Sequence, residues 1–311
     1  MSQRELTILG SSAQTPTRER NHNGYLLRWD REQIVFDPGE GTQRQLLLAG
    51  RSASKITRIC VTHFHGDHCL GLPGLIQRLN LDRAKGPVHV YFPVEGTPYF
   101  ENLRGAAAFH EGTSLKVVPW ADGATDPGPA FTLSARTLQH RIPTLGWRIE
   151  EPPRRHLLPD RLAEFGLEGP VVGNLQREGV VEVHGRRITI EQVSETRPGQ
   201  RFAFIMDTAL CDAAFELAAD ADLVVCEATY LTGDEGLARR YQHLTAAQAG
   251  RIAAEAGARR LVLTHFSQRY PDPGQFAAEA NEFFDDVVLA QDLQTVAVPP
   301  RRNATPSGAS R

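Results

Sequence analysis

The chain has 311 residues, 41% hydrophobic and 23% charged, enough to bury a substantial core in one large domain or two small ones. Its formal net charge of −3 argues against general affinity for nucleic acid, so a bound polyanion has to meet a local basic patch. The N-terminus has no apolar signal-like region, and no apolar run reaches the length of about 18 residues that a membrane span needs, so we expect a cytoplasmic protein without membrane contact.

Short apolar runs of strand length alternate with helical patterns along the chain, which is typical of an α/β fold. Strands are expected at 55–62, 131–140, 201–208, 222–229 and 259–265, and a helix at 245–258 with Thr245 as its N-cap. Each expected strand ends in, or directly before, a histidine or an acidic residue. Strand ends at one edge of a sheet converge, so we expect these side chains to share one site. They are His63, His140, Asp207, Glu227 and His265.

The stretch VTHFHGDH at 61–68 carries three histidines and one aspartate within six residues. Imidazole and carboxylate suit zinc or a similar borderline ion, and a site without thiolates usually leaves a position open for water, as catalytic sites do. In an extended loop His63 and His65 point the same way and can hold one ion, while Asp67 and His68 begin the next segment and can face a second. The alternative is a histidine-rich surface turn with accidental spacing.

The stretch THFHGDHCLGLPGL (62–75) resembles the metal-binding motif of the metallo-β-lactamase superfamily, whose fold is an αββα sandwich of two similar halves. Four further motifs narrow the resemblance: FDPGEGTQRQ (36–45), CEAT (226–229), HLT (243–245) and THFSQRY (264–270). Together they resemble the ribonuclease Z family of endonucleases, which trim the 3′ trailer from precursor tRNA. The match extends from Leu9 to about Leu293, and only the ordered set is specific, since the histidine cluster alone indicates just the superfamily.

The resemblance implies two Zn²⁺ ions per subunit and a metal-dependent endoribonuclease, although the sequence leaves the choice between zinc and manganese open. One ion would be held by His63, His65 and His140, the other by Asp67, His68 and His265, with Asp207 bridging them. Water activated between the ions would attack the phosphodiester and leave a tRNA 3′-hydroxyl and a trailer 5′-phosphate.

Three residues receive catalytic roles from the same resemblance. Asp67 would orient or deprotonate the attacking water, while Glu227 and His243 would relay a proton to the leaving oxygen. Some of the residues assigned by the resemblance also have ordinary alternatives. Taken singly, His140 suits a core or capping histidine, Asp207 suits a helix cap, and Glu227 suits a partner for a nearby arginine.

Residues 149–200 are rich in proline, glycine and charge, and they interrupt two strands that otherwise lead to the site. In the ribonuclease Z family this interval resembles a flexible arm that grips tRNA, and the resemblance places substrate binding at Gly169, Pro170, Leu175 and Gly179. The interval holds seven arginines, nine acidic residues and no lysine. Binding therefore has to rely on backbone amides and on placed arginines, such as Arg154, Arg155, Arg186 and Arg187. The alternative is a solvated linker with a charged face.

We therefore expect one metallo-β-lactamase-like catalytic domain over 1–298, interrupted by the arm at 149–200, and a disordered tail at 299–311. The resemblance also implies a homodimer, for which the helix carrying Leu72, Leu75, Ile76 and Leu79 offers either an interface or a core. Two rival functions stay open. A small-molecule hydrolase of the same fold, such as a thioesterase, lactonase or phosphodiesterase, needs no arm, and a noncatalytic RNA-binding relative would have lost metal ligands.

Overall fold

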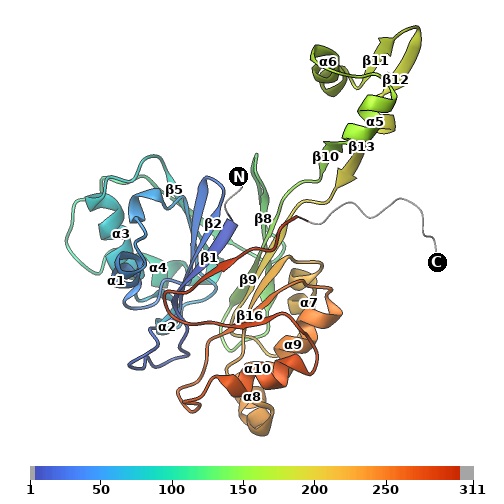
Figure 1. The fold of residues 1–311 in the computed structure, drawn as a ribbon. Coiled ribbons are helices and arrows are strands. Elements are labelled where there is room, and N and C mark those ends of the chain that lie inside the picture. The colour runs from blue at the N-terminus through green and yellow to red at the C-terminus, as the bar shows by residue number, and fades with distance from the viewer. Residues whose placement is uncertain (1–3, 302–311) are drawn as a thin grey trace.

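Two seven-stranded sheets lie face to face at the centre of the computed structural model, which describes residues 4–301 (Figure 1). The first sheet has the order β18-β1-β2-β3-β4-β5-β6 and the second β17-β16-β15-β14-β9-β8-β7. The strands of the first sheet are β1 (Arg4–Gly10), β2 (Gly24–Trp29), β3 (Glu32–Phe36), β4 (Arg58–Cys60), β5 (Val88–Pro93), β6 (Leu115–Trp120) and β18 (Thr295–Ala297). Those of the second are β7 (Thr125–Pro127), β8 (Thr132–Leu138), β9 (Thr144–Glu150), β14 (Arg201–Ile205), β15 (Leu223–Glu227), β16 (Leu261–Thr264) and β17 (Val287–Leu289).

Helices cover the outer face of each sheet, which confirms the predicted αββα sandwich (Figure 1). Helices α1, α3 and α4 pack on the first sheet, and α7, α9 and α10 lie over the second. The helices are α1 (Thr42–Leu48), α2 (Gly66–Cys69), α3 (Leu72–Leu81), α4 (Thr97–Arg104), α5 (Pro159–Glu164), α6 (Pro170–Glu178), α7 (Asp212–Ala218), α8 (Glu235–Tyr241), α9 (Ala246–Glu255) and α10 (Gly274–Asn281). Short 3-10 turns are η1 (Ala53–Lys55), η2 (Val94–Gly96), η3 (Ile190–Val193) and η4 (Thr232–Asp234).

The alternation of side chains along a strand divides the apolar residues between two cores. In β3, Ile34 and Phe36 point into the core between the sheets, whereas Val35 points into the core beneath α1, α3 and α4. The ring of Phe36 stacks on Phe204 from the second sheet, with 4.7 Å between the ring centroids. The apolar positions of α3, Leu72, Leu75, Ile76 and Leu79, are buried in the second of these cores, so they serve packing within the chain.

Four of the five expected strands form within their predicted ranges, as β8, β14, β15 and β16. The first is shorter than predicted, because residues 53–55 make a 3-10 turn and only Arg58–Cys60 pair as β4. The predicted helix is α9, and Thr245 caps it. Its hydroxyl accepts the Gln248 N–H at 3.2 Å, and its own N–H donates to Oε1 of Gln248 at 3.0 Å.

The segment between β9 and β14 extends away from the sandwich as an arm (Figure 1). Its stem is an antiparallel ribbon of β10 (Arg154–Leu157) and β13 (Ser194–Arg197), and its outer part holds α5, α6 and a hairpin of β11 (Val180–Val183) and β12 (Arg186–Thr189). The outer part has a small core of its own, made by Leu167, Leu175, Ile188 and Val193.

The structure describes only the beginning of the predicted tail. Residues 299–301 contact the arm at Glu151 and Gln200 and the sandwich at Arg259, and 302–311 lie outside the described residues. Within residues 4–301, no helix combines the length and apolar character that crossing a membrane requires.

Candidate metal centre

The loops that follow several strands meet at one edge of the sandwich. Strands β14, β15 and β16 are parallel neighbours, so their carboxyl ends bring Asp207, Glu227 and His265 to the same edge. The loop after β8 adds His140, and the loop after β4 adds His63 from the opposite sheet. The predicted convergence of strand ends is therefore present in the structure.

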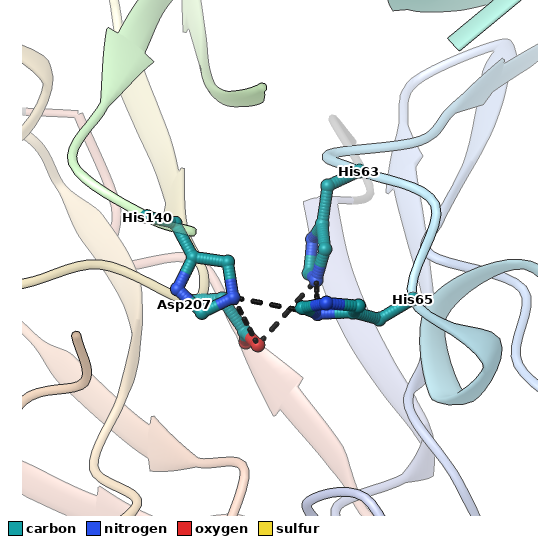
Figure 2. A group of neighbouring side chains, drawn as sticks. All are labelled: His63, His65, His140 and Asp207. Atoms are coloured by element: carbon teal, nitrogen blue, oxygen red, sulfur yellow. Dashed lines mark hydrogen bonds and ion pairs between the residues drawn. The ribbon is translucent and has the colours of Figure 1, made fainter. Parts of the chain in front are cut away.

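The first group of donor atoms consists of His63, His65, His140 and Asp207, whose side chains point toward one another (Figure 2). Nε2 of His63 lies 3.0 Å from Nδ1 of His65, and that nitrogen lies 3.3 Å from Nε2 of His140. Oδ2 of Asp207 is 3.4 Å from Nε2 of His63. All these donor atoms lie within 4.8 Å of one another, which is close enough to share one ion.

The second group consists of Asp67, His68 and His265, and Asp207 joins it to the first. The Nε2 atoms of His68 and His265 are 3.2 Å apart, and Oδ2 of Asp67 lies 3.3 Å from the first and 3.4 Å from the second. Oδ1 of Asp207 is 3.3 Å from His68 Nε2 and 3.1 Å from His265 Nε2. Because its two oxygens face different groups, Asp207 occupies a bridging position.

The donor set fits metal binding better than a closed hydrogen-bond network. Oδ1 of Asp207 is buried, yet among the described residues it accepts no hydrogen bond. The imidazole nitrogens at the centre lie 3.0 to 3.3 Å from one another. When unprotonated, such nitrogens direct their lone pairs to a common point, where a cation can bind them. Imidazole nitrogen and carboxylate oxygen, without thiolate, are ligands that zinc and related ions accept in catalytic sites.

Hydrogen bonds behind the imidazole rings fix their orientation. Nδ1 of His63 is bonded to the Thr62 hydroxyl at 2.9 Å, and Nδ1 of His265 to the Thr229 hydroxyl at 2.7 Å. Nδ1 of His140 lies 3.0 Å from the carbonyl oxygen of residue 242. These bonds leave the Nε2 atoms for the centre of the site, as partners of metal-binding histidines do.

His68 is supported by a carboxylate that the sequence analysis did not assign to the site. Nδ1 of His68 lies 2.8 Å from Oδ2 of Asp37, which also accepts the Thr62 hydroxyl at 2.7 Å. Asp37 belongs to the quoted motif FDPGEG, which was therefore a usable signal. Gly39 of the same motif touches the metal loop, since a Cβ at this position would lie 2.2 Å from the carbonyl oxygen of Asp67.

Burial and charge keep two of the histidines in the neutral form that binds metals. Burial lowers the pKa of His63 to about 3 and that of His65 to about 4. Burial alone would raise the pKa of Asp207, but the imidazoles of His265 and His68 lower it well below its ordinary value. His63 and His65 are therefore neutral imidazoles beside an ionised central carboxylate. His68 differs: burial lowers its pKa, but the carboxylates of Asp207 and Asp67 outweigh this and raise it well above its ordinary value.

Glu227 and His243 form a hydrogen-bonded pair beside this centre. Nδ1 of His243 lies 3.1 and 3.2 Å from the two carboxylate oxygens of Glu227 and 3.9 Å from Oδ2 of Asp207. Burial lowers the pKa of His243, but the carboxylates of Glu227 and Asp207 outweigh this and raise it to about 9. Glu227 is fixed in turn by the N–H of Thr208 at 2.6 Å and the hydroxyl of Thr229 at 2.5 Å.

The metal centre and His243 face a cavity of about 540 Å³. Its lining includes Asp67, Asp207, His243 and His265. The lining also includes arginine and aromatic side chains, namely Arg141, Arg269, Tyr230 and Tyr241. The sequence analysis did not single out these four. They supply positive charge and ring faces, which suit phosphate and base.

The predicted arm residues lie apart from this cavity and have structural contacts of their own. Gly169 (φ 59°) and Gly179 (φ 75°) flank α6, and Pro170 is its first residue, while Leu175 is buried in the small core of the arm. Arg154 and Arg155 are paired with carboxylates: Arg154 with Glu151 at 2.9 Å and Arg155 with Glu191 at 2.8 Å.

Comparison with known proteins agrees with this fold and site. Residues 17–183 match a family model described as the metallo-beta-lactamase superfamily, and residues 182–266 match one described as a beta-lactamase superfamily domain. The first match covers more than half of the chain. The fold and the paired histidine and carboxylate groups thus define a metal-binding protein of the metallo-β-lactamase superfamily.

Full-length relatives narrow the assignment. The chain is 59% identical to ribonuclease Z of Salinispora arenicola over 97% of its own length and 98% of that protein, and 54% identical to ribonuclease Z of Nocardia farcinica over 97% and 100%. The crystal structure of the short form of human tRNase Z superposes with a TM-score of 0.69 at 26% identity, over 95% of this chain and 100% of the human one. The chain belongs to the ribonuclease Z family, as its motifs predicted.

Proposed function

We propose that this chain is a zinc-dependent endoribonuclease that removes the 3′ trailer from precursor tRNA and leaves a tRNA 3′-hydroxyl and a trailer 5′-phosphate. Its family makes it a metal-dependent endoribonuclease. The observation that carries the proposal is the arrangement of Asp207 between two donor groups, beside the Glu227–His243 pair in one cavity. The substrate follows from similarity to ribonuclease Z proteins over nearly their whole length.

Two zinc ions per subunit fit the two donor groups. His63, His65 and His140 would hold one ion, Asp67, His68 and His265 the other, and Asp207 would contact both. Such a pair of ions activates water for attack on phosphorus and neutralises the charge that develops on the phosphate oxygens.

The protein's own side chains position the substrate and move protons. Asp67 lines the cavity, where its carboxylate can accept the proton of the attacking water. Glu227 holds Nδ1 of His243, so that Nε2 of the same ring is the atom that can deliver a proton to the leaving 3′-oxygen. Arg141 and Arg269 line the same cavity and can bind phosphates on either side of the cleaved bond.

The arm, residues 149–200, is proposed to bind the body of the tRNA. It extends away from the sandwich (Figure 1), and its hairpin carries Arg186 and Arg187 exposed on β12. Arginines placed along such a projection can contact backbone phosphates although the arm has no excess of basic residues. In this proposal Gly169, Pro170, Leu175 and Gly179 give the outer arm its shape, and Arg154 and Arg155 belong to its stem.

A homodimer is proposed from the surface formed by the helices of the first half. Large apolar side chains are exposed there: Leu47 and Leu48 on α1, Leu81 at the end of α3 and Tyr99 on α4. Leu47 is 68% exposed and Leu81 77%, and a second copy would remove such surface from water. We also propose a cytoplasmic location, because the proposed substrate is a precursor tRNA.

The deciding experiment is cleavage of a 5′-labelled precursor tRNA that carries a 3′ trailer, with purified protein at a few molar equivalents of zinc and with a chelated control. A single metal-dependent cut directly after the discriminator base is expected. Uncut RNA at full zinc occupancy would reject the tRNA substrate and favour a small-molecule hydrolase of the same fold. A protein without stoichiometric zinc would instead fit a noncatalytic RNA-binding relative.

A further inference from the structure

The two ends of the arm meet in a buried polar cluster, which we call the arm anchor: Arg4, Glu151, Gln200 and Arg301. The N–H of Glu151 donates to the carbonyl oxygen of Gln200 at 3.0 Å, and Gln200 returns its N–H to Oε2 of Glu151 at 3.3 Å. Gly199 permits this approach, because a Cβ there would lie 1.9 Å from the Glu151 carbonyl oxygen. The carboxylate of Glu151 is therefore held between the outgoing and returning segments, with the residue only 1% exposed.

Arg4 connects this carboxylate to the first sheet, 147 residues away in sequence. Its Nη2 donates to Oε1 of Glu151 at 2.8 Å and its Nη1 to Oε2 at 3.0 Å, so the pair is bidentate. Nη1 also donates to Oε1 of Gln200 at 2.8 Å, and Nη2 to Oδ2 of Asp30 at 2.6 Å. The guanidinium lies 4.2 Å above the ring of Trp29. The Arg4 side chain thus binds both ends of the arm to the first sheet, where β1 begins and β2 ends.

The last described residues of the chain bind the same cluster. Nη2 of Arg301 donates to Oε1 of Glu151 at 2.7 Å, and Nε2 of Gln200 donates to the carbonyl oxygen of Pro299 at 2.5 Å. Arg154, the first residue of β10, adds a third arginine contact to Oε1 of Glu151 at 2.9 Å. Both termini of the described chain and both ends of the arm therefore converge on one buried carboxylate.

The anchor lies at the root of the arm, where a small change in angle produces a large displacement of the arm tip. The arm is continuous with the sandwich through these two segments, and its stem is a two-stranded ribbon, which has little stiffness of its own. Strand β14 leads from Arg201, next to Gln200, to Ile205, two residues before Asp207. The anchor and the metal centre are thus about 20 Å apart along one strand. A small tilt at the root would displace the arm tip while the centre stays in place.

We propose that Glu151 and Arg4 are positioning residues, which set the angle of the arm so that a tRNA bound by it reaches the cavity with its 3′ end. This inference rests on the proposed function, in which the arm binds tRNA. A small phosphodiester needs only the cavity, so its hydrolysis should not depend on the anchor, whereas binding of a substrate that spans arm and cavity should.

The test measures KM and kcat of Glu151→Gln for a precursor tRNA, beside hydrolysis of bis(p-nitrophenyl) phosphate. We expect KM for the precursor to rise about tenfold, the equivalent of one lost charge-assisted hydrogen bond, with kcat and small-ester hydrolysis unchanged. Glu150→Gln is the matched control, because Glu150 also pairs with two arginines, Arg148 and Arg201, but these lie on body strands. The control should leave KM unchanged.

The anchor role would be overturned if Glu151→Gln lost activity equally on precursor tRNA and on bis(p-nitrophenyl) phosphate, or if its KM for the precursor did not change. If Glu151→Gln does not fold, Arg301→Ala decides, since it removes one contact from the same carboxylate and should raise KM alone by a smaller factor. Replacing Arg186 and Arg187 by alanine tests the arm itself. If KM of that variant is unchanged, tRNA binding by the arm is rejected. If its KM rises while KM of Glu151→Gln and Arg301→Ala does not, only the anchor role is rejected.

Discussion

Asp37 holds Nδ1 of His68 at 2.8 Å, although the two residues are 31 positions apart and come from different motifs. The contact directs Nε2 of His68 toward Asp67, Asp207 and His265. A carboxylate behind a metal-binding imidazole fixes the ring and increases its basicity.

Asp37→Asn should therefore weaken metal binding without removing a ligand. We expect zinc affinity to fall about 10- to 100-fold, the usual effect of losing such a partner, and activity to return at high free zinc. Titration of activity against buffered free zinc measures this shift. Asp126→Asn serves as control, because Asp126 is likewise hydrogen-bonded to a ring side chain, the hydroxyl of Tyr91, but lies on β7 away from the centre. Loss of activity that zinc cannot restore would assign Asp37 a different role.

His243→Ala should lower kcat for precursor tRNA by roughly 10²- to 10⁴-fold, the range for a general acid or base. Its Nδ1 is engaged by Glu227, so we expect the zinc content to stay the same. His243 also lies near Asp207 and His265, and these three side chains could themselves hold an ion. Elemental analysis of the purified variant shows whether zinc is retained. His89→Ala, a half-buried histidine on β5, is the control. Stoichiometric loss of one zinc would make His243 a ligand instead.

The sequence allowed prediction of those parts of the site that depend on local order. Strands ending in His140, Asp207 and His265 could be located by apolar runs, and the cluster at 61–68 by its spacing, because a metal site needs several donors at strand ends. Thr245 as an N-cap was equally local. The match to the ribonuclease Z family then supplied the pairing of these residues, which spacing alone does not contain.

What the sequence did not reveal depends on contacts between distant segments. Arg4 and Glu151 are 147 positions apart, and neither carries a motif, so only the folded chain brings them together. Leu175 is buried in the outer arm because α6 packs on the hairpin, a tertiary contact that a glycine–proline motif does not indicate. The strand predicted at 55–62 is shorter in the structure for a similar reason. Ala53 and Ile56 pack beneath α3, and this contact stabilises a 3-10 turn where the strand was expected to begin.

Zinc should raise the thermal stability of the protein in proportion to the logarithm of its concentration. Two converging donor groups around Asp207 are costly to assemble without a cation, and a ligand that binds only the folded state stabilises it by about 2.7 kcal/mol at 100 times its Kd. That corresponds to a rise in Tm of several degrees for a chain of this size. Differential scanning fluorimetry across a zinc series, with His63→Ala as the matched variant, measures it. The same rise in His63→Ala would mean that zinc stabilises the protein elsewhere.

The charge of Glu151 should make part of the stability dependent on pH. Burial alone would raise the pKa of Glu151, but its hydrogen bonds from Arg4 and Gln200 lower it below the ordinary value of 4.5. A lowered folded-state pKa means that the contribution is complete above about pH 4.5 and is lost as pH falls through the folded-state pKa. At pH 7, Glu151→Gln should cost about 3 to 5 kcal/mol, because it leaves the buried guanidinium of Arg4 without its main partner.

This loss should shrink in acid, since protonation removes the same charge from the unsubstituted protein. Urea unfolding of both proteins at pH 7 and pH 3.5, with chelator present so that zinc release does not contribute, compares the two free energies of unfolding. Glu150→Gln should cost much less at pH 7, because Glu150 is partly exposed and its ion pairs are weakened by solvent. A difference between the unsubstituted protein and Glu151→Gln that stays constant down to pH 3.5 would show that Glu151 stabilises the arm root by its shape and not by its charge.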